Sequence, residues 1–218
     1  DIRMERVGYT RKDIAACRDE VVRGIVPVVA RLKEMQAARI GVDRLRFYDD
    51  PLSFKEGNPT PKGTPEEILA NGQKMYHGLS AETADFIDFM MAGGLFDVLA
   101  KPSKAPGGYC TYIPAYKSPF IFSNFNGTAG DVDVLTHEAG HAFAAYQASK
   151  QSLASELRNP GLESCEIHSM SMEFLTVEYH NLFFAEDTKK YEISHAEDTL
   201  FFLPYGCQVD EFQERVYD

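Results

Sequence analysis

The stretch Gly130–Phe143, GDVDVLTHEAGHAF, has the apolar spacing of a helix, and His137, Glu138 and His141 interrupt it. Residues four apart on an α-helix lie on one face, so the two imidazoles point the same way and can share one metal ion. Glu138 borders that face, close to any water beside the ion, without needing to bind the ion itself. The HEAGH sequence therefore predicts a helix that carries part of a zinc site.

Two neighbouring features bear on this helix. Thr128 and Asp131 are three apart and offer a cap for the N-terminus of the helix. Gly140 is costly inside a helix, by about 1 kcal/mol relative to alanine. Either a close approach by a neighbouring element or ordinary tight packing would explain the glycine.

A zinc site that leaves one position open for water needs a third protein ligand. Position 147 is Gln147, which excludes a third histidine six residues after His141. A glutamate on a separate helix is the natural alternative. The segment LESCEIHSMSMEFLTVEYH, after a loop near residues 158–161, supplies the candidates Glu163, Glu166, His168, Glu173, Glu178 and His180. Spacing alone does not choose among them.

The rest of the chain is mostly helical in pattern. Helices are expected over residues 11–38, with Pro27 either kinking or ending the first, over 64–76, over 81–99, and from 132 onward with a kink at Pro204. Residues 109–126 are rich in aromatic and β-branched side chains and predict a small antiparallel β element, whose prolines Pro114 and Pro119 suggest exposed edge strands. The fold class expected is mainly α, with this β element before the HEAGH helix.

Bulk composition excludes several classes of function. A formal net charge of -11 argues against nucleic acid as a partner, and the lack of a long apolar run argues against a membrane span. Four scattered cysteines without a CxxC pair predict reduced thiols and a cytoplasmic protein. Residue 1 is Asp with no leader after it, and the last residues stop within a helical pattern, so we expect an excerpt of a longer chain without a signal peptide.

Several segments together resemble the M3 peptidases, specifically the oligoendopeptidase F branch. The resemblance covers nearly the whole chain and is carried by HEAGHAF, FIFSNFNGTAGDVDVLT before it, LESCEIHSMSMEFL after it, and by RDEVVRGIVPVVARLKEMQAARIGVDRLRFYD, GTPEEIL, GGYCTY and LPYGCQVDEFQERVY. It implies a zincin-like helical metallopeptidase catalytic region. Residues 1–218 would form a single partial catalytic domain, comprising a helical segment with a Pro/Gly-rich connector (1–108), the β element (109–126) and the zinc-binding helices (127–218).

The resemblance also implies roles for individual residues. The family's E-x-x-S pattern maps onto Glu166 and Ser169, which makes Glu166 the third zinc ligand beside His137 and His141. Ser169 and Glu173 would support the ligands from outside, with Glu173 reaching an imidazole. The backbone near Ser123 and Asn124 would receive the peptide, since peptides often add as a strand to a sheet edge.

The implied activity is zinc-dependent endopeptidase cleavage of short peptides. One Zn²⁺ acidifies a water and polarises the scissile carbonyl, and Glu138 takes the proton of the water and delivers it to the leaving amine. The residues that stabilise the tetrahedral intermediate in the family lie beyond Asp218, so this excerpt should hydrolyse peptides poorly.

Two other interpretations of the sequence remain open. One is a non-catalytic peptide-binding module with a structural zinc whose four positions are all filled by protein atoms. The other is a metal-free helical interaction domain in which His137 and His141 are core residues. Oligomeric state and substrate preference have no signal in the sequence.

Overall fold

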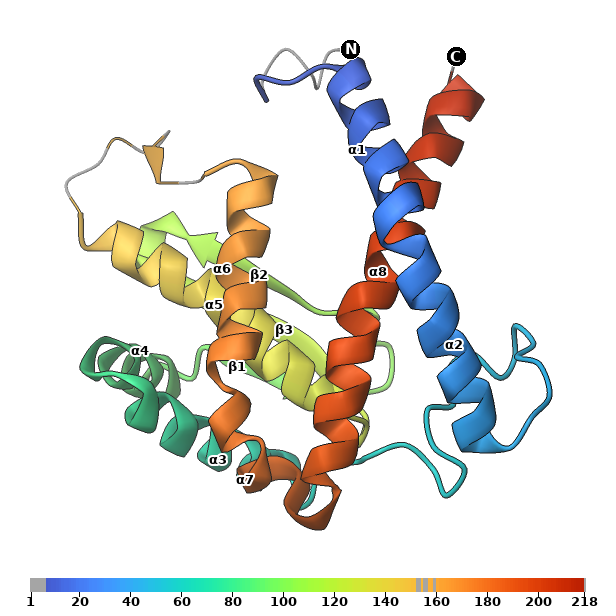
Figure 1. The fold of residues 1–218 in the computed structure, drawn as a ribbon. Coiled ribbons are helices and arrows are strands. Elements are labelled where there is room, and N and C mark those ends of the chain that lie inside the picture. The colour runs from blue at the N-terminus through green and yellow to red at the C-terminus, as the bar shows by residue number, and fades with distance from the viewer. Residues whose placement is uncertain (1–6, 152–153, 155–156, 159, 218) are drawn as a thin grey trace. The chain divides into compact units, whose positions relative to one another are not determined.

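The computed structural model describes residues 7–151, 154, 157–158 and 160–217. It is mainly helical with one small sheet (Figure 1), which confirms the expected fold class. The chain divides into two compact units, one formed by Asp1–Asn58 with Lys189–Asp218 and the other by Pro59–Thr188. A single partial catalytic domain stays a prediction. None of the helices in the described part is long and apolar enough to cross a membrane.

In the residues that the structure describes, the first unit consists of three long helices. They are α1 (Arg11–Gly24), α2 (Val26–Ile40) and α8 (Thr188–Tyr217). The helix expected over residues 11–38 is broken at Ile25, and Pro27 lies in the first turn of α2, where its missing N–H costs no helical hydrogen bond. Pro27 thus marks the end of the first helix. Pro204 lies inside α8, which continues through it.

The second unit contains the HEAGH helix and the sheet. Its elements are α3 (Pro65–Leu79), α4 (Ala81–Ala92), β1 (Phe96–Leu99), β2 (Tyr109–Ile113), β3 (Ser118–Phe125), α5 (Gly130–Ser149), α6 (Leu162–Leu175) and α7 (Asn181–Phe184), with short 3₁₀ turns at Pro114–Tyr116, Val177–Tyr179 and Ala185–Asp187. Thr64 caps α3 through a reciprocal bond with Glu67, at the start of the helix expected from residue 64.

The helix expected over residues 81–99 is too long by seven residues. Helix α4 ends at Ala92, and Gly93 and Gly94 follow, the latter at φ +60°. Residues Phe96–Leu99 then pair with β3 as the parallel strand β1. The helical pattern is misleading at these residues because a distant strand, not local periodicity, decides their conformation.

The sheet has the order β1-β3-β2, so it is mixed and not purely antiparallel. Strand β3 is the middle one of the three, which makes the expectation of an exposed edge wrong for this strand. Pro119 has no backbone N–H to donate, and it lies where β3 has a neighbour on one side only: Tyr112 of β2 pairs with it, whereas β1 joins β3 only from Ile121 onward. The proline is therefore tolerated in the middle strand. Among these strands, β2 keeps a free edge beside the HEAGH helix.

Helix α5 lies between the sheet and α6 (Figure 1). Its buried residues Val132, Leu135 and Ala139 form the centre of the second unit. The Tyr76 hydroxyl of α3 donates to the Leu135 carbonyl at 3.2 Å, and the rings of Phe86 and Phe143 are 5.4 Å apart. The HEAGH helix is therefore held on several sides by core packing.

The expected cap of α5 by Thr128 and Asp131 is wrong. The N-cap residue is Ala129, without a side-chain cap. Asp131 is buried within the first turn, and its carboxylate instead accepts the backbone N–H groups of Asn126 at 2.9 Å and Gly127 at 2.8 Å. The acid thus fixes the loop between β3 and the helix by pairing with two backbone N–H groups of that loop.

Candidate metal centre

Three side chains from two helices meet at one point. Glu166 Oε2 of α6 lies 3.3 Å from His137 Nε2 and 3.8 Å from His141 Nε2. One ligand atom from each residue falls within 4.8 Å of the other two. Among the histidine, cysteine and acidic residues in the described part of the chain, these three lie close enough together to hold one metal ion. Two imidazoles and a carboxylate with space for one more ligand are typical of a catalytic zinc site, so the donor set fits zinc.

Gly140 explains how α6 comes so close to α5. A Cβ at this position would lie 2.6 Å from the Ser169 Cα and 2.9 Å from the His168 carbonyl oxygen. Of the two explanations for this glycine, the structure therefore supports the close approach. Because Gly140 lies between the two histidines and Ser169 is three residues after Glu166, this contact determines the spacing of the whole group.

Glu173 supports His137 from the side away from the candidate ion. Its Oε1 lies 2.6 Å from His137 Nδ1, so the ring donates there and keeps Nε2 toward Glu166. This hydrogen bond raises the pKa of His137, and burial opposes the rise. Metal-binding histidines commonly have such a carboxylate partner, which orients the ring and makes it more basic.

Ser169 supports the third candidate ligand. Its hydroxyl, fully buried, donates to Glu166 Oε2 at 3.0 Å. The Glu166 side chain is itself half exposed, with 52% of its surface open. A hydroxyl fixed in the helix interface therefore holds one end of a carboxylate that would otherwise be free to rotate.

Glu138 lies where α5 faces β2. Burial raises its pKa, while His137 and a backbone hydrogen bond with Cys110 lower it. A carboxylate with a raised pKa is a better proton acceptor at neutral pH. Burial also raises the pKa of the Cys110 thiol to about 12, so this neighbour stays protonated. The HEAGH pattern gives no sign that Cys110 lies beside Glu138, because this contact depends on how β2 packs against α5.

His141 differs from His137 in its surroundings. Burial and the nearby His137 lower its pKa. The neutral ring that a metal requires is therefore favoured at His141.

Ser123 and Asn124 lie on the middle strand β3 and not at the edge of the sheet. Ser123 is buried, and the Asn124 amide donates to the carbonyls of Ala105 at 2.8 Å and Gly107 at 3.1 Å. Both residues line a cavity of about 560 Å³ that extends to Val134, one turn before Glu138. Their part in receiving a substrate stays a prediction.

Comparisons with known proteins agree with this arrangement. The family model that describes peptidase family M3 matches residues 6–218 of this sequence. The chain belongs to peptidase family M3. It is 54% identical to a protein from Bacillus anthracis strain Ames described as an oligoendopeptidase F, with a TM-score of 0.94 over 98% of this chain and 39% of that chain. It is 52% identical to Pz peptidase A, solved with an inhibitor, with a TM-score of 0.94 over 98% of this chain and 38% of that chain.

More distant similarity concerns the fold alone. A protein from Chlamydophila abortus described as a peptidase is 20% identical, with a TM-score of 0.63 over 88% of this chain and 32% of that chain. A comparison with curated protein sequences gives no match. This M3 chain spans less than two fifths of the length of the solved relatives.

Proposed function

We propose that this chain carries the catalytic centre of a zinc-dependent endopeptidase that cleaves short peptides. The observation that carries the proposal is the convergence of His137, His141 and Glu166, with Glu138 on the same helix as the two histidines. Membership of family M3 supports the same reaction class. A single Zn²⁺, held by the three converging residues, would supply Lewis acidity that acidifies a water and polarises a peptide carbonyl.

Two glutamates of the chain would transfer the proton and orient a metal ligand. Glu138, through its carboxylate, accepts a proton from the attacking water and returns it to the nitrogen of the leaving amine. Its raised pKa, caused mainly by burial, suits both halves of this transfer. Glu173 keeps His137 in one tautomer, with the proton on Nδ1 and Nε2 available as a ligand.

A peptide would be seated along the free edge of β2. Main-chain hydrogen bonds to an exposed strand bind extended peptides largely independently of sequence. Cys110 of β2 is bonded through its backbone to Glu138, so a peptide on this edge passes close to the base. The cavity lined by Ser123 and Asn124 would accept part of the substrate next to this edge. Cytoplasmic location and weak hydrolysis by this chain alone stay predictions.

The variant Glu138→Gln tests the proposal. Zinc content, measured by atomic emission on the purified protein, should stay at one ion per chain, because Glu138 is not among the converging ligands. Hydrolysis of a quenched fluorescent peptide, with products confirmed by mass spectrometry after long incubation, should fall by roughly 10²- to 10⁴-fold.

Three results would count against this assignment. Unchanged hydrolysis in Glu138→Gln would remove Glu138 from the role of base. Zinc bound by the native chain with all four positions filled by protein atoms, and no hydrolysis, would favour a structural zinc site. A chain that binds no zinc would favour a metal-free interaction domain.

A further inference from the structure

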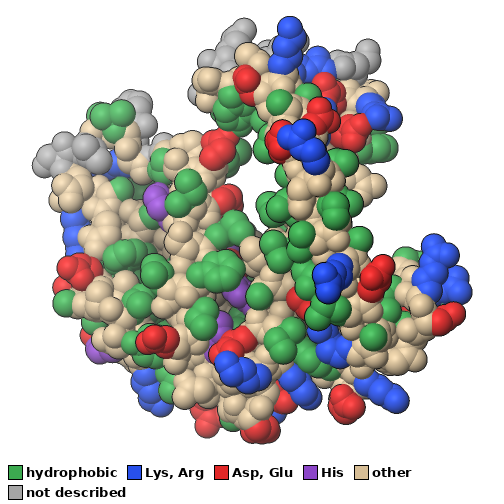
Figure 2. Space-filling view, viewed as in Figure 1, with side chains coloured by type: hydrophobic (Ala, Val, Ile, Leu, Met, Phe, Trp, Pro, Cys, Tyr) green, Lys and Arg blue, Asp and Glu red, His purple; other side chains and the backbone are tan. Residues whose placement is uncertain are grey.

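Helix α6 has an apolar face that its packing on α5 does not use. Ser169 and Met172 point into the α5 contact and are buried. On the other side, Ile167 is 64%, Phe174 46% and Leu175 60% exposed. Figure 2 shows hydrophobic side chains at the surface over the part of the molecule occupied by α6. Apolar side chains gathered on one exposed face commonly mark a binding site.

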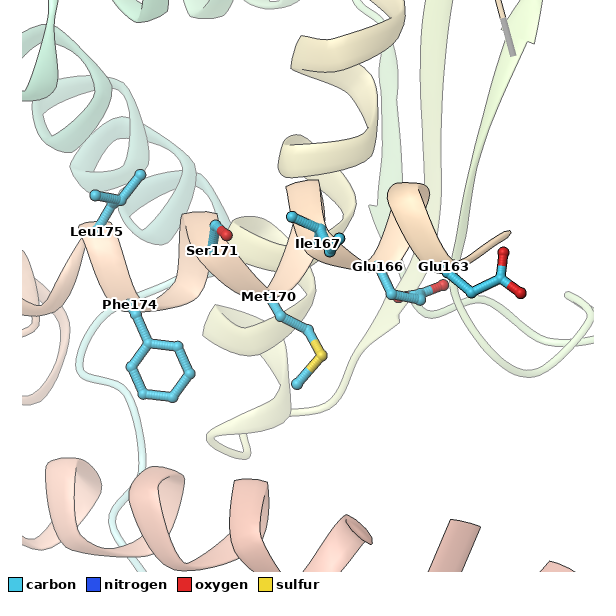
Figure 3. A pocket seen from close by; sticks show the side chains of 7 residues that line it. All are labelled: Glu163, Glu166, Ile167, Met170, Ser171, Phe174 and Leu175. Atoms are coloured by element: carbon cyan, nitrogen blue, oxygen red, sulfur yellow. The ribbon is translucent and has the colours of Figure 1, made fainter. Parts of the chain in front are cut away.

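This face borders an open groove of about 660 Å³. The groove is lined by Glu163, Glu166, Ile167, Met170, Ser171, Phe174 and Leu175. In Figure 3 the two acids lie at the N-terminal end of the helix, and Met170 and Phe174 project to the same side further along. The groove therefore has one acidic end and an apolar body.

Glu166 belongs to both the groove and the candidate metal centre. The groove consequently begins at the point where the scissile carbonyl of a peptide would be held. Met170 is one turn and Phe174 two turns beyond Glu166, about 6 and 12 Å along the helix axis. An extended peptide advances about 3.3 Å per residue, so side chains within a few residues of the scissile bond can reach both positions.

We propose that the α6 groove is the subsite for an apolar side chain of the peptide, on one side of the scissile bond. This inference rests on the proposed peptidase function and adds a substrate preference to it. Burying a side chain of leucine size against Ile167, Met170 and Phe174 removes apolar surface of both partners from water. Glu163, at the acidic end, disfavours aspartate and glutamate in the same position of the substrate.

Binding of peptide hydroxamates to the zinc-loaded protein tests the subsite without any turnover. The hydroxamate anchors at the metal, and two series place leucine, alanine or aspartate on either side of it. In one series, titration calorimetry should show leucine binding about 10-fold more tightly than alanine, because a few methylene groups are buried. Aspartate should bind more weakly than alanine in that series.

Ile167→Gln and Phe174→Gln should each bring the leucine-to-alanine ratio toward one and leave zinc content unchanged. Ile167 is 64% and Phe174 46% exposed, and the urea midpoint of each variant checks that folding is undisturbed. Leu162→Gln is the matched control, since Leu162 is 80% exposed on the same helix and does not line the groove. This control should keep the native ratio.

The outcomes separate the subsite from the peptidase proposal. A native ratio of one in both series, or a native ratio unaffected by Ile167→Gln and Phe174→Gln, would overturn the subsite. The expected ratios in a zinc protein that cleaves no peptide would support the subsite and count against the peptidase proposal. Absence of zinc in the native chain would remove both.

Discussion

The two units of the molecule join their helices by opposite means. In the second unit, α5 and α6 meet backbone to backbone at Gly140, where even a methyl group would lie 2.6 Å from a Cα atom. In the first unit, α2 and α8 are joined by Arg39 and Glu197, whose two parallel bonds measure 3.0 and 2.6 Å. A glycine contact fixes the distance between two helices closely, whereas flexible side chains tolerate small shifts. The rigid contact lies where three candidate ligands must meet.

The largest effect is expected from breaking the ion pair of the first unit. Glu197 is only 7% exposed, so Arg39→Met leaves a buried carboxylate without its partner. Breaking a buried pair in this way costs about 3–5 kcal/mol of unfolding free energy. Urea denaturation followed by circular dichroism measures the loss.

The double variant Arg39→Met/Glu197→Leu is the control for that experiment. Replacing both charges by apolar groups of similar size is often neutral or stabilising, so most of the loss should be recovered. A double variant as unstable as Arg39→Met would show that packing of the arginine, for example on the Phe54 ring at 4.7 Å, matters more than the charge.

Gly140→Ala should break the rigid contact of the second unit. Overpacking costs about 1–3 kcal/mol, and the better helix propensity of alanine returns at most about 1 kcal/mol. Zinc affinity should fall as well, because α6 must move away and carry Glu166 with it. Denaturation and zinc titration with a competing chelator measure the two losses.

Gly206→Ala in α8 is the matched control. The nearest atoms to its added Cβ are those of the Phe202 ring at 3.8 Å, an ordinary contact. This variant should be neutral or more stable by up to about 1 kcal/mol, since alanine favours a helix interior. Equal losses in the two alanine variants would contradict the special role of the α5–α6 contact.

Glu173→Gln should weaken zinc binding by about 10- to 100-fold and leave the fold intact. The glutamine can still accept the Nδ1–H of His137, but without the negative charge that makes the ring more basic. Glu163→Gln removes the same charge from the same helix and should have a much smaller effect on zinc affinity. Similar losses in both variants would mean that general attraction of the cation, and not the support of His137, is the cause.

How much the sequence predicts depends on the range of the interaction. The i, i+4 spacing of His137 and His141 is local and indicates a shared face directly. Spacing cannot choose Glu166 among six candidates, because the choice depends on how α6 packs; only the family resemblance points to it, and the structure brings it to the two histidines. Strand β1 escapes prediction for a related reason, since its partner β3 lies more than twenty residues further along.

The smallest effect concerns the pH dependence of a half-buried ion pair in the first unit. Hydrogen bonds from Arg18, and then from Arg11, lower the pKa of Glu214 on α8. A carboxylate whose pKa is lowered on folding stabilises the protein above its unfolded pKa, here near 4.5, and the stabilisation is lost as the pH falls through the folded value. Glu214→Gln should therefore be slightly less stable than the native chain at pH 7, and the difference should disappear well below pH 4.5.

Urea midpoints of both proteins across this pH range measure the difference in stability. About 1 M NaCl at pH 7 should reduce that difference, because salt screens charges that solvent can reach. A difference that does not shrink at all as the pH falls below 4.5 would assign the contribution of Glu214 to packing instead, and α1 and α8 would then be joined by contact more than by charge.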